Sequence, residues 1–153
     1  MKKICPGFTL IELLLVISIT GILFSLGVSQ YMKFNRQQML SQSAQELKNN
    51  LRYAQSKAMA GEKPEGCGNQ SLEGYKLVFP DDQNYKIVAV CNADIDVRTG
   101  LSLRKNVVKI SGPDQIRFKV LAQGVIDFGT IVLQYSDIGN TEPVTVTEAG
   151  EIR

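Results

Sequence analysis

Apolar residues are concentrated near the start of the chain. No charged side chain lies between Glu12 and Lys33. Twenty uncharged residues with a helical rise of about 1.5 Å form a helix of roughly 30 Å, which matches the core of a bilayer. The pattern therefore predicts a single membrane span. Because Lys2 and Lys3 precede this segment, we expect the N-terminus to stay in the cytoplasm and the rest of the chain to face the other side.

An amphipathic helical pattern follows the apolar segment. Its apolar residues recur at alternating intervals of four and three, the period of one helix face. These residues are Leu40, Ala44, Leu47, Leu51, Ala54 and Ala58. No proline lies between Phe8 and Gly61, and Pro64 comes just beyond. We therefore expect one helix over about residues 9–60.

Beyond Pro64 the apolar residues alternate with polar ones, as in strands with one buried face. These runs cover residues 75–79, 85–90, 101–110, 115–120, 130–135 and 144–147. Turn signals such as Pro80-Asp81-Asp82 separate them. We expect an α+β fold, in which about six antiparallel strands form a sheet covered by the apolar face of the helix.

The N-terminal sequence GFTLIELLLVISITGIL resembles that of type IV prepilins and of the pseudopilins of type II secretion. A short basic leader ends in Gly7, Phe8 follows, and Glu12 lies just inside the apolar run. The resemblance implies cleavage after Gly7 by a prepilin peptidase and N-methylation of Phe8. It also implies assembly with other pilin subunits, through an inner-membrane platform, into a helical filament. The expected segments are a leader (1–7), a transmembrane or filament-core helix (8–34) and a globular domain (35–153).

Glu12 is an acidic residue next to an apolar segment, and two interpretations fit it. It can be an interfacial charge that reaches the lipid head groups. Alternatively, as the resemblance implies, it pairs in the filament with the Phe8 α-amine that cleavage frees, in its own chain or in a neighbour. An ionisable group inside a span usually has a partner, which favours the second interpretation.

A second resemblance concerns LKNNLRYAQSKAMAGEKP on the helix and the final VTVTEAGEIR, which are similar to the GspH/FimT group of minor pseudopilins and pilins. Gly150 and Arg153 match the end of the Gly-Arg-x-Arg pattern of its DNA-binding members, but Glu151 replaces the first arginine. This departure argues against DNA binding.

The net charge of the chain also argues against DNA binding. Without Lys2 and Lys3, the 17 basic residues fall to 15 and equal the 15 acidic ones, which argues against a generally nucleic-acid-binding surface. A local basic cluster still leaves that role open. It comprises Arg98, Arg104, Lys105, Lys109, Arg117 and Lys119. The candidate nucleic-acid contacts are Arg98, Arg104, Lys105 and Arg153.

Cys67 and Cys91 lie in the part predicted to be outside the cytoplasm, where disulfides form, whereas Cys5 belongs to the leader. The chain has no histidine, so a zinc site would lack ligands. A Cys67–Cys91 disulfide is the preferred interpretation, and two free buried thiols are the alternative.

Catalytic chemistry has no candidate residues. The sequence lacks histidine, a glycine-rich phosphate loop after a strand and a nucleophile elbow, so we expect neither an enzyme nor a cofactor. Asp81-Asp82 and Asp94-x-Asp96 resemble Ca²⁺ ligands. They lack the glycine and terminal acid of a calcium loop, and we interpret them as turn residues.

The sequence thus predicts a structural subunit, specifically a minor H-type pilin that initiates or decorates a filament. The alternatives are a major pilin, a DNA-binding minor pilin of a transformation pilus, and a pseudopilin of a secretion machine. We expect the subunit in the cytoplasmic membrane before assembly and in an extracytoplasmic or cell-surface filament afterwards.

Overall fold

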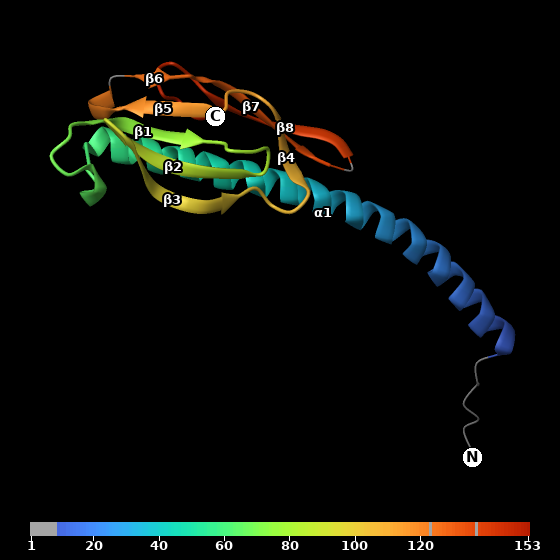
Figure 1. Ribbon diagram of the computed structural model, residues 1–153. Coiled ribbons are helices and arrows are strands. Elements are labelled where there is room, and N and C mark those ends of the chain that lie inside the picture. The colour runs from blue at the N-terminus through green and yellow to red at the C-terminus, as the bar shows by residue number, and fades with distance from the viewer. Residues whose placement is uncertain (1–8, 123, 137) are drawn as a thin grey trace, which may run out of the picture. The chain divides into compact units, whose positions relative to one another are not determined.

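The computed structural model describes residues 9–122, 124–136 and 138–153. Its described part contains the long helix α1 (Leu10–Ala60), short 3-10 turns at Glu65–Cys67 and Val120–Ala122, and eight strands (Figure 1). Every strand pair is antiparallel. The predicted α+β class, with a long N-terminal helix packed against antiparallel strands, is confirmed.

The strands form two sheets rather than the single sheet of about six strands expected from the sequence. A five-stranded sheet has the order β3-β2-β1-β5-β6, and a three-stranded sheet has the order β4-β7-β8. The strands are β1 (Leu72–Val78), β2 (Asn84–Cys91), β3 (Asp94–Ser102), β4 (Val107–Ser111), β5 (Gln115–Lys119), β6 (Val125–Ile126), β7 (Gly129–Tyr135) and β8 (Ile138–Val146).

The apolar run over residues 101–110, expected to be one strand, is divided between the two sheets. Asn106 has a φ of 67°, which interrupts the extended backbone. The N–H of Val107 donates to the carbonyl of Arg104 at 2.9 Å and closes a turn there. This turn separates the end of β3 from the start of β4.

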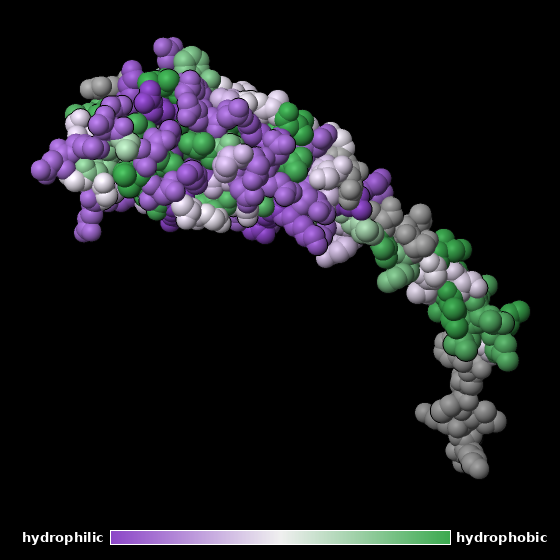
Figure 2. Space-filling view, viewed as in Figure 1, coloured by the Kyte–Doolittle hydropathy of each residue, from purple (hydrophilic) through white to green (hydrophobic). Residues whose placement is uncertain are grey.

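Residues are grouped into two compact units, one up to Arg36 and one from Gln37 to Arg153. Apolar side chains dominate the described surface of the first unit, whereas hydrophilic ones cover much of the second (Figure 2). Leu10, for example, is 77% exposed. Within the residues that the structure describes, no helix combines the length and apolar character needed to cross a bilayer, so the span expected over residues 8–34 is not confirmed.

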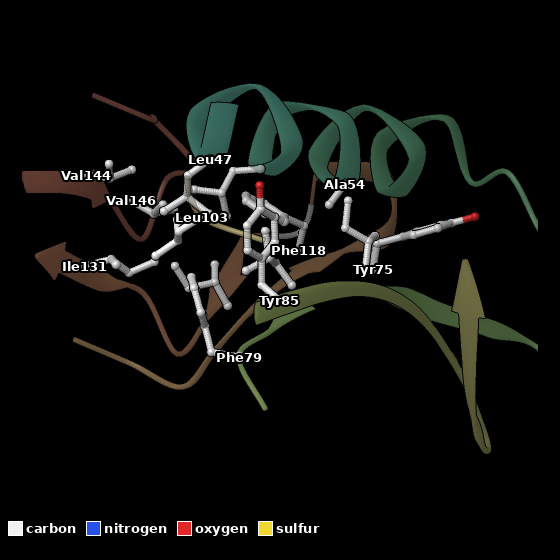
Figure 3. Close-up of a cluster of buried hydrophobic side chains, with 14 of the residues drawn as sticks. Leu47, Ala54, Tyr75, Phe79, Tyr85, Leu103, Phe118, Ile131, Val144 and Val146 are labelled. Atoms are coloured by element: carbon white, nitrogen blue, oxygen red, sulfur yellow. The ribbon is translucent and has the colours of Figure 1, made fainter. Parts of the chain in front are cut away.

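The core of the second unit lies between α1 and both sheets. All six residues of the predicted apolar helix face are buried, from Leu40 to Ala58. Figure 3 shows Leu47 and Ala54 of α1 above side chains of both sheets, among them Phe118 and Val144. Burying a large apolar side chain stabilises a fold by about 1.5–3 kcal/mol, so this shared core holds the two sheets together.

The predicted disulfide between Cys67 and Cys91 is present. Cys67 lies in the 3-10 turn that follows α1, Cys91 ends β2, and their Cα atoms are 5.8 Å apart. Both residues are buried in the core. The bond therefore ties the connection after α1 to the five-stranded sheet and excludes two free thiols.

Removing this bond should lower the stability of the globular unit. The cysteines are 24 residues apart, and chain-entropy reasoning for a loop of that size gives about 3 kcal/mol. We expect Cys67→Ala/Cys91→Ala to lose about this much in urea unfolding of a fragment starting at Gln37, with wild type under reductant as the control. An unchanged unfolding midpoint, or two alkylatable thiols in natively purified protein, would contradict the assignment.

Candidate functional site

Thr9 begins helix α1 by capping its first turn. The N–H of Glu12 donates to Thr9 Oγ1 at 3.3 Å, and the N–H of Leu13 donates to the Thr9 carbonyl at 3.2 Å. Threonine is a preferred N-cap, and a glutamate three residues later is the spacing of a capping box. The sequence prediction missed this role of Thr9, although the Thr-x-x-Glu spacing signals it.

Glu12 lies in the first turn of α1, where the partial positive charge of the helix N-terminus favours a carboxylate. Its side chain is exposed, as are those of Leu10 and Ile11. Within the described part of the chain, the Glu12 carboxylate forms no ion pair. The predicted cleavage and methylation positions, Gly7 and Phe8, lie outside the described residues.

Two hydroxyls in the apolar part of α1 are bonded within the helix. Ser18 Oγ donates to the Leu14 carbonyl at 2.8 Å, and Thr20 Oγ1 donates to the Val16 carbonyl at 2.7 Å. Such back-bonding satisfies the hydroxyl without water. These side chains can therefore enter a dry environment at low cost. The charged residue in the first turn of α1 is Glu12.

Side chains of α1 hold two of the four candidate nucleic-acid contacts. Arg98 donates to Asn50 Oδ1 at 3.2 Å, and its guanidinium lies 4.4 Å from the centroid of the Tyr53 ring. Arg104 forms a 2.9 Å ion pair with Glu46. Both side chains thus have partners within the globular unit.

The basic residues of the sequence cluster do not form one patch in the fold. Lys109 is 8% exposed and pairs with Asp114 at 2.6 Å. Arg117 lies on β5, which β1 and β2 separate from Arg98 on β3. Among the described residues of this sequence cluster, Arg98, Lys105 and Lys119 form no ion pair, and Arg98 instead contacts the neutral Asn50 and Tyr53. The cluster seen along the sequence is therefore dispersed in the fold.

The C-terminus folds back on β8. Gly150 has a φ of 87° and makes the turn, and the Arg153 backbone exchanges hydrogen bonds with Thr145. Nε and Nη2 of Arg153 each lie 2.8 Å from a carboxylate oxygen of Glu151. Their hydrogen bonding lowers the pKa of Glu151 and raises that of Arg153. Glu151 thus lies where the Gly-Arg-x-Arg pattern has its first arginine, and its carboxylate also pairs with Arg153.

Because of this pair, we expect a fragment starting at Gln37 to bind duplex DNA only nonspecifically at physiological salt. Glu151→Arg should strengthen binding, because it adds one cation and releases Arg153. The slope of log affinity against log salt should then steepen by about 2. Mobility shifts at several salt concentrations measure this, with Arg153→Ala as the control. Submicromolar wild-type binding that Arg153→Ala abolishes would contradict the expectation and favour a DNA-binding subunit.

One of the two aspartate pairs is a turn element, as predicted, and the other is not. Asp81 Oδ1 accepts the N–H groups of Gln83 and Asn84 at 2.8 and 2.7 Å, and bonding to Asn84 lowers the pKa of Asp81. The turn assignment is wrong for Asp94 and Asp96, which lie in β3.

Asp94 pairs with Lys76 at 2.6 Å, and Asp96 pairs with Lys86 at 2.8 Å. Since β3 is an edge strand, where charged side chains discourage further strand pairing, acidic residues suit it. In the part of the chain that the structure describes, no group of three or more His, Cys, Asp or Glu residues could hold a metal ion.

Residues 2–28 match the prokaryotic N-terminal methylation motif. No solved structure matched the chain. The N-terminal motif, together with the long helix packed on antiparallel strands, supports one class of protein, the type IV pilins and pseudopilins. The match supports a type IV pilin-like or pseudopilin subunit, as the N-terminal sequence predicts, and it implies pilin subunits and a prepilin peptidase as partners.

Proposed function

We propose that this chain is a minor, H-type subunit that initiates or decorates a type IV pilus or a type II secretion pseudopilus. The observation that carries the proposal is the combination of the methylation motif with Glu12 in the first turn of α1, whose carboxylate has no ion pair among the described residues. The sequence similarity of its helix and C-terminal turn to the GspH/FimT group supports the minor subtype.

Assembly in this proposal follows from one electrostatic interaction. Prepilin peptidase cleaves after Gly7, Phe8 is N-methylated, and the apolar helix holds the subunit as a single span with its N-terminus in the cytoplasm. The assembly platform then moves the subunit into a filament on the cell envelope. In the dry filament core, Glu12 neutralises the Phe8 amine of its own chain or of a neighbour.

DNA binding is the alternative that the geometry disfavours. Arg153, Arg104 and Lys109 are each paired with an acidic residue, and the basic residues of the sequence cluster do not gather into one patch. A major pilin remains the alternative within the same class, and the number of copies per filament separates it from a minor one.

Intact-mass analysis of the membrane form tests the processing step. We expect the loss of residues 1–7 and the addition of one methyl group, because the Gly7-Phe8 junction lies within the matched motif. Cells that lack the prepilin peptidase provide the control and should retain the full-length chain. A protein that begins at Met1 in cells that have the peptidase would contradict the proposal.

A further inference from the structure

We propose that a hollow on the β5–β6 side of the five-stranded sheet, lined by Arg117 and Lys119, binds an acidic side chain of an adjacent filament subunit. This inference rests on the proposed function, which places the chain among other subunits. Strands β5 and β6 lie side by side there (Figure 1). The hollow has a volume of about 300 Å³, and its other lining residues are Glu73, Val120 and Ile126.

The strand register places this hollow on the face of the sheet that is turned away from the core. Arg117 is paired with Ile126 of β6 and with Lys76 of β1, and residues directly opposite each other in antiparallel strands lie on the same face. The chain neighbours of Arg117, Ile116 and Phe118, point the other way and are buried in the core. The hollow is therefore accessible to a partner.

The two cations of the hollow have little opposing charge nearby. Within the part of the chain that the structure describes, Lys119 forms no ion pair, and the residue opposite it on β1 is Gly74, which has no side chain. Nη1 of Arg117 lies 3.7 Å from the Glu73 carboxylate, too far for a hydrogen bond. Both cations are half-buried, so a charged acceptor replaces water that they have partly lost.

The lining favours a protein carboxylate over a nucleic acid. Val120 and Ile126 provide an apolar wall, against which the methylene groups of an aspartate or glutamate pack while the carboxylate contacts the two cations. A duplex presents a series of phosphates and needs several cations along its backbone. The exposed Glu73 carboxylate repels such a polyanion more strongly than a single carboxylate. Because the methylation motif implies pilin subunits as partners, we assign the carboxylate to an adjacent subunit.

Zero-length cross-linking of intact filaments with a carbodiimide tests this contact. The reagent takes up one water and joins an amine to a carboxylate that touches it. We expect mass spectrometry to find Lys119 joined by an amide bond to an aspartate or glutamate of another subunit. Lys119→Arg is the control, because it keeps the charge and should enter filaments normally without forming this link. A link only to Glu73 of the same chain, or no link at Lys119, would overturn the inference.

Charge reversal in the full-length chain measures how much the contact contributes to assembly. Lys119→Glu should lower the amount of chain in sheared filaments by about tenfold or more, at unchanged leader cleavage and membrane abundance, because repulsion replaces a charge-assisted hydrogen bond. Lys105→Glu is the matched control, since it reverses an exposed lysine that does not line the hollow. Normal incorporation of Lys119→Glu, or an equal loss in both variants, would contradict the inference.

Two further outcomes separate this inference from the proposed function. If the wild-type chain is absent from filaments, the proposed function fails and the inference fails with it. If the wild-type chain enters filaments without the Lys119 cross-link, the inference fails alone. Retention of the wild-type chain on duplex DNA that Lys119→Glu abolishes would assign the hollow to nucleic acid and overturn the inference. The cross-link is measured on the wild-type chain, so it decides the matter even if Lys119→Glu does not fold.

Discussion

Replacing Glu12 with leucine is expected to abolish filament incorporation while the protein still accumulates in the membrane. Removing a charge from a membrane segment lowers its insertion cost by about 2–3 kcal/mol, so insertion should not suffer. In the filament, however, the Phe8 amine would be buried without a counter-charge. Breaking a buried ion pair in this way costs about 3–5 kcal/mol, enough to reduce incorporation by a factor of about 100 or more.

The measurement is the ratio of chain in sheared filaments to chain in membranes. Glu12→Asp is the matched control, because it keeps the charge and shortens the side chain by one methylene. We expect it to retain part of the incorporation that the leucine variant loses. Normal incorporation of Glu12→Leu would instead show that Glu12 is an interfacial charge that reaches the lipid head groups.

Gly74→Ala is expected to have the largest effect on the stability of the globular unit. Gly74 lies in β1 opposite Lys119 of β5, and a Cβ there would lie 2.2 Å from the Phe118 carbonyl oxygen. No side-chain rotation relieves a clash between a Cβ and a backbone atom. The two strands must separate, which disturbs the core residues Tyr75 and Phe118, and we expect a loss of more than about 3 kcal/mol.

Urea unfolding of a fragment starting at Gln37 measures this loss. Gly139→Ala in β8 is the matched control, because a Cβ at Gly139 has no atom within 4 Å. Its free energy of unfolding should stay within about 1 kcal/mol of wild type. A Gly74→Ala fragment with the wild-type unfolding midpoint would show that β1 and β5 are not paired in this register.

Periodicity made the helix and its buried face predictable. The expected helix over residues 9–60 and the observed α1 nearly coincide, because one apolar face continues to Ala58 and prolines lie only outside it. The edge strand β3 was missed although Ile95 and Val97 alternate with charged residues and pack against the core, because Asp94 and Asp96 were interpreted as turn residues.

The sequence was most informative where the chemistry is local. Glu12 and the Gly7-Phe8 junction lie in the segment that matches the methylation motif, and their roles stay predictions. Cys67 and Cys91 allow a single pairing, which the structure contains. The contacts of the basic residues were not predictable from local sequence. The partners of Arg98 and Arg104 lie on α1, 48 and 58 residues earlier, and only the packing of the sheet on the helix brings them together.

The amount of this chain in purified filaments tests the central claim most directly. Cells that have the prepilin peptidase and cells that lack it are sheared, and the chain is quantified by mass spectrometry in the sheared and membrane fractions of each. The proposed function predicts the mature chain, beginning at methylated Phe8, in filaments of the first cells and only the full-length chain, in membranes, in the second. A chain that stays in the membrane fraction of both, while other subunits still form filaments, would contradict it.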